Sequence, residues 1–313
     1  MEIGSFHNVS VYYKNLKALD NLSFSFEKAE IFGLLGPNGS GKTTTMKVLN
    51  GLLKPNSGHA SIEQLEVWKN KNKIKKDIGY CPQFNSFNEK LTVRENIKYF
   101  ADLYKIKGNL DNLAYNTCSY LGLSNKIDTL AENLSGGLKR RLNIALGILH
   151  EPKILFLDEP SVGLDPISRN ELWKLIKKLR SEGTTIILAT NIMEEAEYLC
   201  DRVVLLKNGR NIISGNLSEI RKKIPHTETI IIYTKFSAKT NNKKIIHRIK
   251  KLNGVIDFEF SNDVIKIKTR EKKTGMVKKS ALAILKKSSV GVEDVRVVSS
   301  TLIDAFEILV GSE

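Results

Sequence analysis

Cysteine is scarce in this sequence, and long hydrophobic runs are missing from it. The three cysteines, Cys81, Cys118 and Cys200, lie far apart without a CxxC spacing, so they indicate no disulfide framework. No apolar run approaches the roughly 18 residues that a membrane-spanning helix needs. The N-terminus lacks a basic segment followed by an apolar stretch, so no signal peptide is expected. These absences favour a reducing, cytosolic setting.

Acidic residues are under-represented toward the C-terminus. The net charge is +15, and residues 221–313 hold 20 Lys and Arg against 10 Asp and Glu, whereas residues 1–220 hold 29 against 24. A basic domain can be attracted to anionic lipid or nucleic acid. A Lys- and Asn-rich composition with a solvated basic face explains the same excess. Aromatic and basic residues do not interleave as in nucleic-acid binders, so no specific nucleic acid is expected as a partner.

The first 220 residues alternate between apolar runs and helical patterns, which is typical of an α/β domain with a mainly parallel, buried sheet. An antiparallel edge is expected from two alternating segments, Val9–Tyr13 and Leu22–Phe26. A helical subdomain is expected over about 84–150. The buried strands are expected at Ile31–Leu35, Ile154–Leu157, Thr185–Ala189 and Val203–Leu206.

A second, smaller domain is expected over 226–313. Asn208-Gly209 predicts a two-residue hairpin turn before it, and Pro225 marks the boundary. The expected order is strand, helix, two strands, helix and strand, which is that of an α+β, ferredoxin-like unit. The segments are strand 229–234, helix 242–252, strands 255–260 and 263–268, helix 275–288 and strand 291–298, followed by a last helix over 301–310.

A glycine-rich segment between an expected strand and helix fits the pattern G-x-x-x-x-G-K-[ST] in full. In such a loop, backbone N–H groups wrap the phosphates of a nucleotide and the helix N-terminus adds a positive dipole end. Lys42 is expected to contact the β- and γ-phosphates, with the Thr43 hydroxyl on Mg²⁺. The residues are Gly36, Pro37, Asn38, Gly39, Ser40, Gly41, Lys42 and Thr43, and Thr44 is included as a nucleotide-binding residue.

Two acids end the apolar strand Ile154–Leu157. They emerge at the carboxyl end of the sheet, where ligands of open α/β sheets bind. We expect Asp158 to hold Mg²⁺, directly or through water. Glu159 is expected to polarise a water for in-line attack. An acidic strand end followed by Pro160 is also typical of a simple turn or helix cap, but the phosphate loop upstream favours the catalytic interpretation.

The segment Leu134-Ser135-Gly136-Gly137 opens a helix that runs to about Leu149. Ser135 is a good N-cap, so a simple capped helix accounts for part of the pattern. The tandem glycines distinguish this segment from a simple capped helix, because they leave the backbone free to approach a phosphate.

These elements, in this order, resemble the ATP-binding cassette family, whose ATPase domain matches roughly residues 1–215. Leu134–Gly137 resembles the family signature, and Ser161–Asp165 resembles the D-loop after Glu159. By the same resemblance, Gln83 is the Q-loop glutamine, with a catalytic and a metal-binding role. Tyr13 stands where an aromatic side chain stacks on adenine.

In this family two cassettes bind ATP head to tail. The resemblance therefore implies that Ser135 and Gly137 of one copy contact the γ-phosphate held by Lys42 of another. It implies a homodimer or a paired cassette as partner, together with an integral membrane permease subunit at the cytoplasmic face of the membrane. Domain order and the phrase Thr301–Phe306 resemble the daunorubicin-resistance-type drug exporters.

The sequence departs from the family at Asn191, where most members carry a histidine thought to contact the γ-phosphate and the attacking water. An asparagine amide still donates a hydrogen bond, but it cannot relay a proton. Our hypothesis is that ATP binding and dimerisation survive while hydrolysis is slow; a tolerated substitution is the alternative. Two other functions stay open: a soluble cassette acting on nucleic acid or ribosomes, and a regulatory, low-turnover half of a heterodimer.

Overall fold

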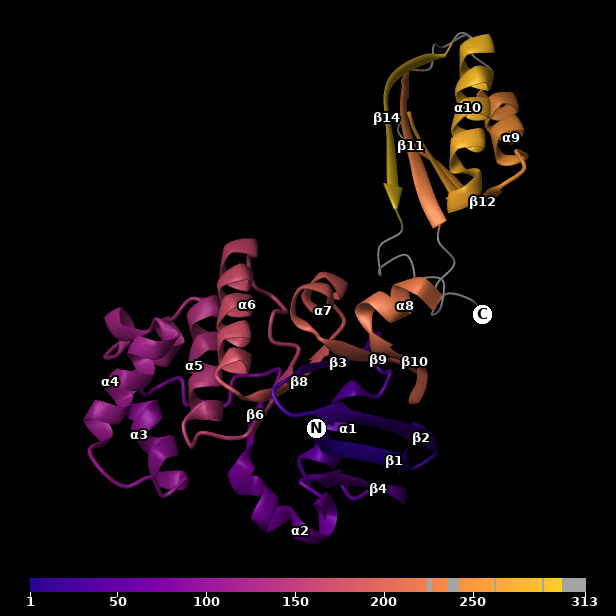
Figure 1. The fold of residues 1–313 in the computed structure, drawn as a ribbon. Helices are drawn as coiled ribbons and strands as arrows, with labels where there is room; N and C mark the ends of the chain where they lie inside the picture. The colour runs from indigo at the N-terminus through magenta and orange to yellow at the C-terminus, as the bar shows by residue number, and fades with distance from the viewer. Residues whose placement is uncertain (224–226, 236–241, 262, 289, 300–313) are drawn as a thin grey trace. The chain divides into compact units, whose positions relative to one another are not determined.

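The computed structural model describes residues 1–223, 227–235, 242–261, 263–288 and 290–299 (Figure 1). The chain divides into two compact units, the first covering Met1–Leu217 and the second beginning at Ser218. The helix expected at 301–310 and the phrase Thr301–Phe306 lie outside the described residues.

The first unit is built on a six-stranded sheet with the strand order β10-β9-β3-β8-β7-β6. Five strands run parallel, and β10 pairs antiparallel with β9 after the predicted Asn208-Gly209 turn. Every residue of β3, β7 and β8 is buried, as the continuous apolar runs predict. The strands are β3 (Ile31–Leu35), β6 (Ile78–Cys81), β7 (Ile154–Asp158), β8 (Thr185–Thr190), β9 (Arg202–Lys207) and β10 (Arg210–Asn216).

A second, antiparallel sheet of this unit has the order β2-β1-β4-β5. Its members are β1 (Glu2–Tyr13), β2 (Leu16–Glu27), β4 (Ser57–Ile62) and β5 (Leu65–Glu66). β1 and β2 are longer than the sequence predicts, because cross-strand pairing extends them past residues without clear alternation, such as the pair Gly4 and Phe26. Helix α1 (Lys42–Leu49) contributes Met46 and Leu49 to the core that both sheets share.

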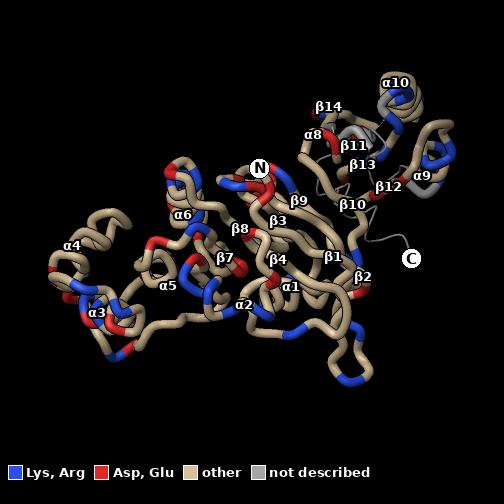
Figure 2. Tube along the Cα trace, turned by 60° about the horizontal axis from the view of Figure 1, so that its bottom comes forward, with Lys and Arg blue, Asp and Glu red and all other residues tan. Residues whose placement is uncertain are grey.

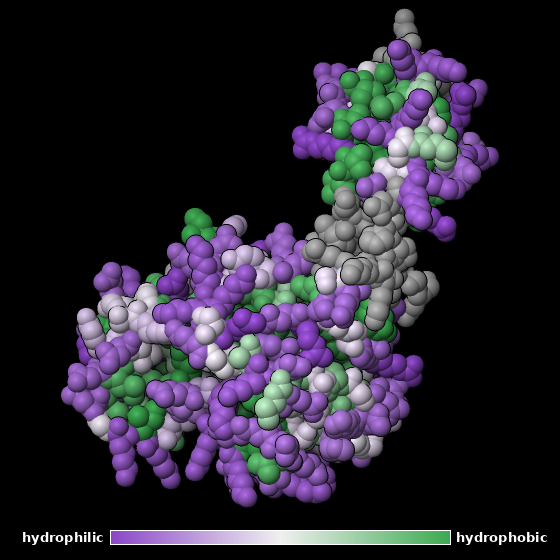
Figure 3. Space-filling model, in the orientation of Figure 1, coloured by the Kyte–Doolittle hydropathy of each residue, from purple (hydrophilic) through white to green (hydrophobic). Residues whose placement is uncertain are grey.

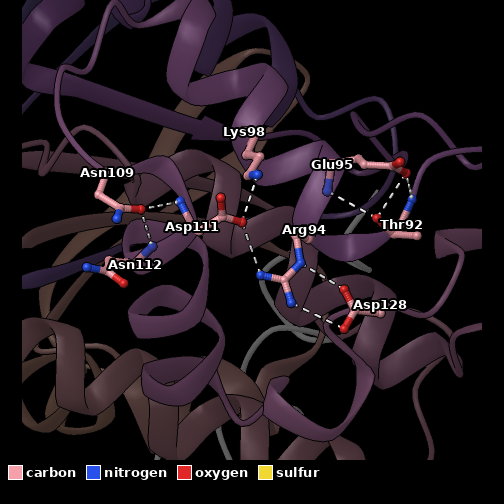
Figure 4. Close-up of polar contacts among 8 residues, drawn as sticks. All are labelled: Thr92, Arg94, Glu95, Lys98, Asn109, Asp111, Asn112 and Asp128. Carbon is pink, nitrogen blue, oxygen red and sulfur yellow. Dashed lines mark hydrogen bonds and ion pairs between the residues drawn. The ribbon is translucent and has the colours of Figure 1, made fainter.

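A helical region lies beside the parallel sheet (Figure 1), and three helices, α3, α4 and α5, fall within the stretch of about 84–150 where a helical subdomain is expected. Figure 4 shows how ion pairs tie this region together: Arg94 contacts Asp128 at 2.8 Å and Asp111 at 3.3 Å, and Asp111 also pairs with Lys98 at 2.7 Å. These contacts join the beginnings of α3 and α4 to the segment that leads to α5. The helices are α2 (Val67–Ile74), α3 (Val93–Leu103), α4 (Leu110–Leu121), α5 (Gly136–Ile148), α6 (Pro166–Ser181) and α7 (Met193–Leu199).

The second unit has the predicted βαββαβ order, and its sheet runs β12-β13-β11-β14 with antiparallel neighbours. The element order and this strand order confirm the ferredoxin-like prediction. The core of the unit consists of residues of two helices together with Ile230, Ile232, Ile265 and Ile267. Lysines and arginines lie along both helices (Figure 2). The elements are α8 (Leu217–Lys223), β11 (Thr227–Lys235), α9 (Asn242–Lys250), β12 (Val255–Ser261), β13 (Val264–Arg270), α10 (Glu271–Lys287) and β14 (Gly291–Ser299).

Helix α10 begins at Glu271, four residues before the predicted start at 275. The first turn is polar and gives no apolar periodicity, so the sequence pattern misses it. Thr274 is nonetheless buried, and its hydroxyl lies 2.7 Å from that of Thr269 on β13. A hydrogen bond between two threonines therefore joins this turn to the sheet.

Within the described residues, no helix is both long enough and apolar enough to cross a membrane. The face of the first unit seen in Figure 3 is largely hydrophilic, with hydrophobic residues in small patches.

Candidate nucleotide-binding site

The phosphate loop connects β3 to α1 and is packed too closely for side chains at two of its glycines. A Cβ at Gly36 would lie 2.4 Å from the carbonyl oxygen of Leu206. Gly41 has a φ of 107°, and a Cβ there would lie 2.9 Å from the carbonyl oxygen of Ala18. Only glycine fits both positions, so the loop is held tightly against β9 and the β1–β2 hairpin.

Lys42 lies at the start of α1 and points back into the loop. It is 4% exposed, and its Nζ donates to the carbonyl oxygens of Gly36 at 2.8 Å and Pro37 at 3.1 Å. The Glu159 carboxylate lies 3.5 Å from the same nitrogen. Burial lowers the pKa of Lys42, and the charge of Glu159 opposes that shift. The ammonium is thus fixed inside the loop, where phosphates bind in this type of motif.

Asp158, at the carboxyl end of β7, is held beside Thr43. Its Oδ2 accepts a hydrogen bond from the Thr43 hydroxyl at 3.1 Å, while its buried Oδ1 has no partner. Burial raises the pKa of Asp158, and the Thr43 hydrogen bond opposes this. Burial and the nearby Asp158 raise the pKa of Tyr80 to about 12, so a neutral phenol lies beside the carboxylate.

The surroundings of Asp158 fit a magnesium ion. Mg²⁺ prefers oxygen ligands and binds through one or two carboxylates plus substrate phosphates, not through a cage of protein side chains. The orphaned Oδ1 of Asp158 and the hydroxyl of Thr43 are such oxygens. Among the described residues, no three His, Cys, Asp or Glu side chains form a cluster that could hold a metal ion.

Glu159 follows β7 in a left-handed backbone conformation, with a φ of 47°, and its N–H donates to the carbonyl of Ala189 at 2.8 Å. This conformation is uncommon for a non-glycine residue and points to a constrained position. The Gln83 amide donates to Oε2 of Glu159 at 3.1 Å, and Lys42 lies on the Oε1 side. The carboxylate is therefore held between Lys42 and Gln83.

Lys42, Thr43, Gln83 and Glu159 line one cleft of about 530 Å³. Tyr13, which the family resemblance places against adenine, is on its wall and 42% exposed. The sequence did not assign four lining residues to the site: Leu16, Lys17 and Ala18, which begin β2 and match no nucleotide-binding motif, and Asn208, which it places only in a hairpin turn. The lining consists of Tyr13, Leu16, Lys17, Ala18, Asn38, Gly39, Gly41, Lys42, Thr43, Thr44, Gln83, Glu159 and Asn208.

Asn191 follows β8 and contacts the tip of the phosphate loop. Its Nδ2 donates to Oδ1 of Asn38 at 3.3 Å, although the two residues are 153 positions apart in the sequence. Asn191 thus lies beside Asn38, which lines the cleft, next to the loop that would hold the phosphates.

The signature residues do not line this cleft. The Ser135 hydroxyl accepts a hydrogen bond from the N–H of Leu138 at 3.4 Å and caps α5. Gly136 is exposed, and the nearest atom that a Cβ there would meet is Cδ2 of Leu164 at 3.8 Å. Gly136 therefore has open space beside its backbone, whereas a Cβ at Gly137 would lie 2.7 Å from the Oγ of Ser168 on α6.

Comparison with known proteins shows to which family the chain belongs. The ABC transporter family model matches residues 19–162. The linearmycin resistance ATP-binding protein LnrL of Bacillus subtilis is 36% identical over 218 residues, which are 69% of this chain and 70% of LnrL. This chain belongs to the ABC transporter family. It is therefore an ABC ATPase, and its candidate site combines the phosphate loop with Asp158 and Glu159 at the end of β7.

Other ABC proteins extend the comparison. The Nod factor export ATP-binding protein I of Burkholderia orbicola is 39% identical, with 67% of this chain and 69% of that protein covered. The ABC transporter A family member 12 of Arabidopsis thaliana is 38% identical over 80% of this chain. The match spans only 28% of that longer protein.

Solved ABC cassettes share the fold. A dimeric, post-hydrolysis structure of the cassette MJ0796 bound to ADP and Pi is 26% identical with a TM-score of 0.63, covering 69% of this chain and 99% of that one. The structure of cbiO1 from Clostridium perfringens, part of the ABC transporter complex cbiONQ, is 27% identical. Its TM-score is 0.65, and the match covers 80% of this chain and 94% of cbiO1.

Proposed function

We propose that this ABC chain binds and hydrolyses ATP as a head-to-tail pair of cassettes and drives export through a membrane-spanning permease. The proposal rests on one observation: the phosphate loop and the signature of the same chain do not lie in one cleft. Lys42, Glu159 and Gln83 meet in one cleft, whereas the open backbone at Gly136 lies outside its lining. A second copy, or a paired cassette, supplies the missing signature. The dimeric MJ0796 cassette supports this arrangement.

Each residue of the cleft has a role in the proposed reaction. Tyr13 stacks on the adenine ring, and the loop N–H groups with Lys42 hold the phosphates. Thr43 and Asp158 would hold Mg²⁺, which would supply positive charge against the phosphates. Glu159 accepts a proton from the attacking water, and Gln83, already hydrogen-bonded to Glu159, orients that water.

Export is proposed from the relatives, whose names include linearmycin resistance and Nod factor export. A membrane permease partner at the cytoplasmic face follows from the same family, of which cbiO1 is one example within a transporter complex. Purification from detergent-solubilised membranes tests this part of the proposal. We expect a membrane-spanning protein to co-purify; salt-sensitive recovery of nucleic acid in its place would contradict the transport role.

Replacement of Asn191 by histidine is expected to raise the steady-state rate of ATP hydrolysis about ten- to a hundredfold. Asn191 already contacts Asn38 at the phosphate loop, so an imidazole there lies close enough to form a charge-assisted hydrogen bond to the γ-phosphate. Such a bond contributes about 1.5–3 kcal/mol. The exposed Asn112→His on α4 serves as the control. An unchanged or lower rate in Asn191→His would show that the asparagine does not limit turnover.

A further inference from the structure

Two buried polar side chains on one face of helix α5 form hydrogen bonds to the loop that carries Gln83. Arg140 and Asn143 are three positions apart, which puts them on the same side of the helix, and they are 6% and 0% exposed. The Arg140 Nη1 donates to the carbonyls of Pro82 at 2.8 Å and Gln83 at 3.2 Å. Its Nη2 donates to the carbonyl of Asp158 at 2.7 Å.

Asn143 holds the same loop further along. Its Nδ2 donates to the carbonyls of Pro82 at 3.2 Å and Phe84 at 3.3 Å, and its Oδ1 accepts from the N–H of Ser86 at 3.0 Å. Together Arg140 and Asn143, here called the α5 clamp, bind backbone groups across Pro82–Ser86. The backbone on both sides of Gln83 is therefore fixed by α5.

The cost of burying Arg140 argues for a role beyond packing. Among the described ion pairs it has no carboxylate partner, and its Nε has no hydrogen-bond acceptor. Buried charged groups often add little net stability compared with hydrophobic residues of similar size. A guanidinium does offer rigid, divergent donors, so it can fix three carbonyls of two different segments at once. Those segments carry Gln83 and Glu159.

We propose that Arg140 is a positioning residue that holds Gln83 in contact with Glu159. Through α5, Arg140 also links this contact to the signature at Gly136, where the helix begins. The Gln83 amide lies 3.1 Å from the Glu159 carboxylate, and Arg140 binds the backbone of Gln83 and of Asp158, the residue before Glu159. Because a helix is stiff, a shift at Gly136 moves Arg140 about one turn further along. This second step rests on the proposed head-to-tail pairing: docking of a partner's nucleotide on the signature adjusts the chain's own cleft.

The test compares two arginines that are adjacent on α5. Arg141 donates to the carbonyl of Leu121 at 3.2 Å and contacts Glu171, so it does not touch the clamped loop. We expect Arg140→Met to lower kcat at least about tenfold, equivalent to about 1.4 kcal/mol, while the Kd for ATP stays within about twofold. Arg141→Met should leave both unchanged. Arg140→Lys should recover part of kcat, because an ammonium still donates to carbonyls.

Two results would overturn the inference: equal kcat values for Arg140→Met and Arg141→Met, or a fall in ATP affinity that accounts for the whole loss of activity. Thermal unfolding of each variant identifies a folding defect. If Arg140→Met fails to fold, Arg140→Lys carries the test, with a reduced kcat and an unchanged Kd expected. A wild-type chain without ATPase activity would contradict the proposed function, whereas an active wild type with an unaffected Arg140→Met contradicts this inference alone.

Discussion

Replacement of Lys42 by alanine is expected to weaken ATP binding about a hundredfold or more. Its ammonium is buried in the phosphate loop, where it donates to Gly36 and Pro37 and lies 3.5 Å from Glu159. Phosphate oxygens would replace the carbonyls as partners when ATP binds. Charge-assisted hydrogen bonds contribute about 1.5–3 kcal/mol each, so the loss of two of them accounts for a change of this size.

Fluorescent-nucleotide titration or calorimetry with the purified chain measures this effect. Lys47→Ala is the matched control, because Lys47 lies on the same helix α1 and its side chain is exposed. ATP affinity should fall in Lys42→Ala and stay unchanged in Lys47→Ala. Equal affinities of Lys42→Ala and wild type would show that the nucleotide does not bind in this loop.

Replacement of Glu159 by glutamine is expected to lower kcat about a thousandfold without loss of ATP binding. A positioned general base contributes about 10²–10⁴-fold to a rate. The amide keeps the shape of the side chain and can still contact Gln83, but it cannot accept the proton of the attacking water. Because ATP is held and not consumed, an ATP-bound dimer should accumulate.

Phosphate-release kinetics and size-exclusion chromatography with Mg²⁺ and ATP measure the two effects. Glu63→Gln is the control, since Glu63 also has a left-handed backbone, with a φ of 48°, but belongs to the turn between β4 and β5 outside the cleft. Nearly normal turnover of the Glu159→Gln variant would show that a group other than Glu159 acts as the general base.

The local parts of the site could be predicted from the sequence because their chemistry is contiguous. The phosphate loop spans eight residues between a strand and a helix, and Asp158 and Glu159 end an apolar strand, so motif and periodicity are enough. The ferredoxin-like unit was predictable for the same reason: its strands and helices alternate with clear patterns.

Contacts between distant segments could not be predicted. Arg140 meets Gln83 across 57 positions and Asn191 meets Asn38 across 153, and neither pair has a local pattern that signals its partner. The sequence pattern of α5 indicates only an apolar stripe, so a buried arginine on that helix goes unnoticed. Asn208 marks a turn in the sequence, but only the fold brings that turn to the cleft wall.

The central claim is that a second cassette completes the site, and a mixing experiment with two inactive variants tests it most directly. Lys42→Ala disables the phosphate loop. Gly136→Glu adds an acid at the open N-terminus of α5, where this copy has room and the helix dipole favours it, but where it would repel a partner's phosphates. Each variant alone should be inactive.

In a mixed dimer, one of the two sites combines the intact Lys42 of one chain with the intact Gly136 of the other. We therefore expect an equimolar mixture to recover ATPase activity, up to about a quarter of the wild-type rate when dimers form at random and sites act independently. A mixture that stays inactive although mixed dimers form, or a Gly136→Glu variant that is fully active alone, would contradict a site shared between two copies.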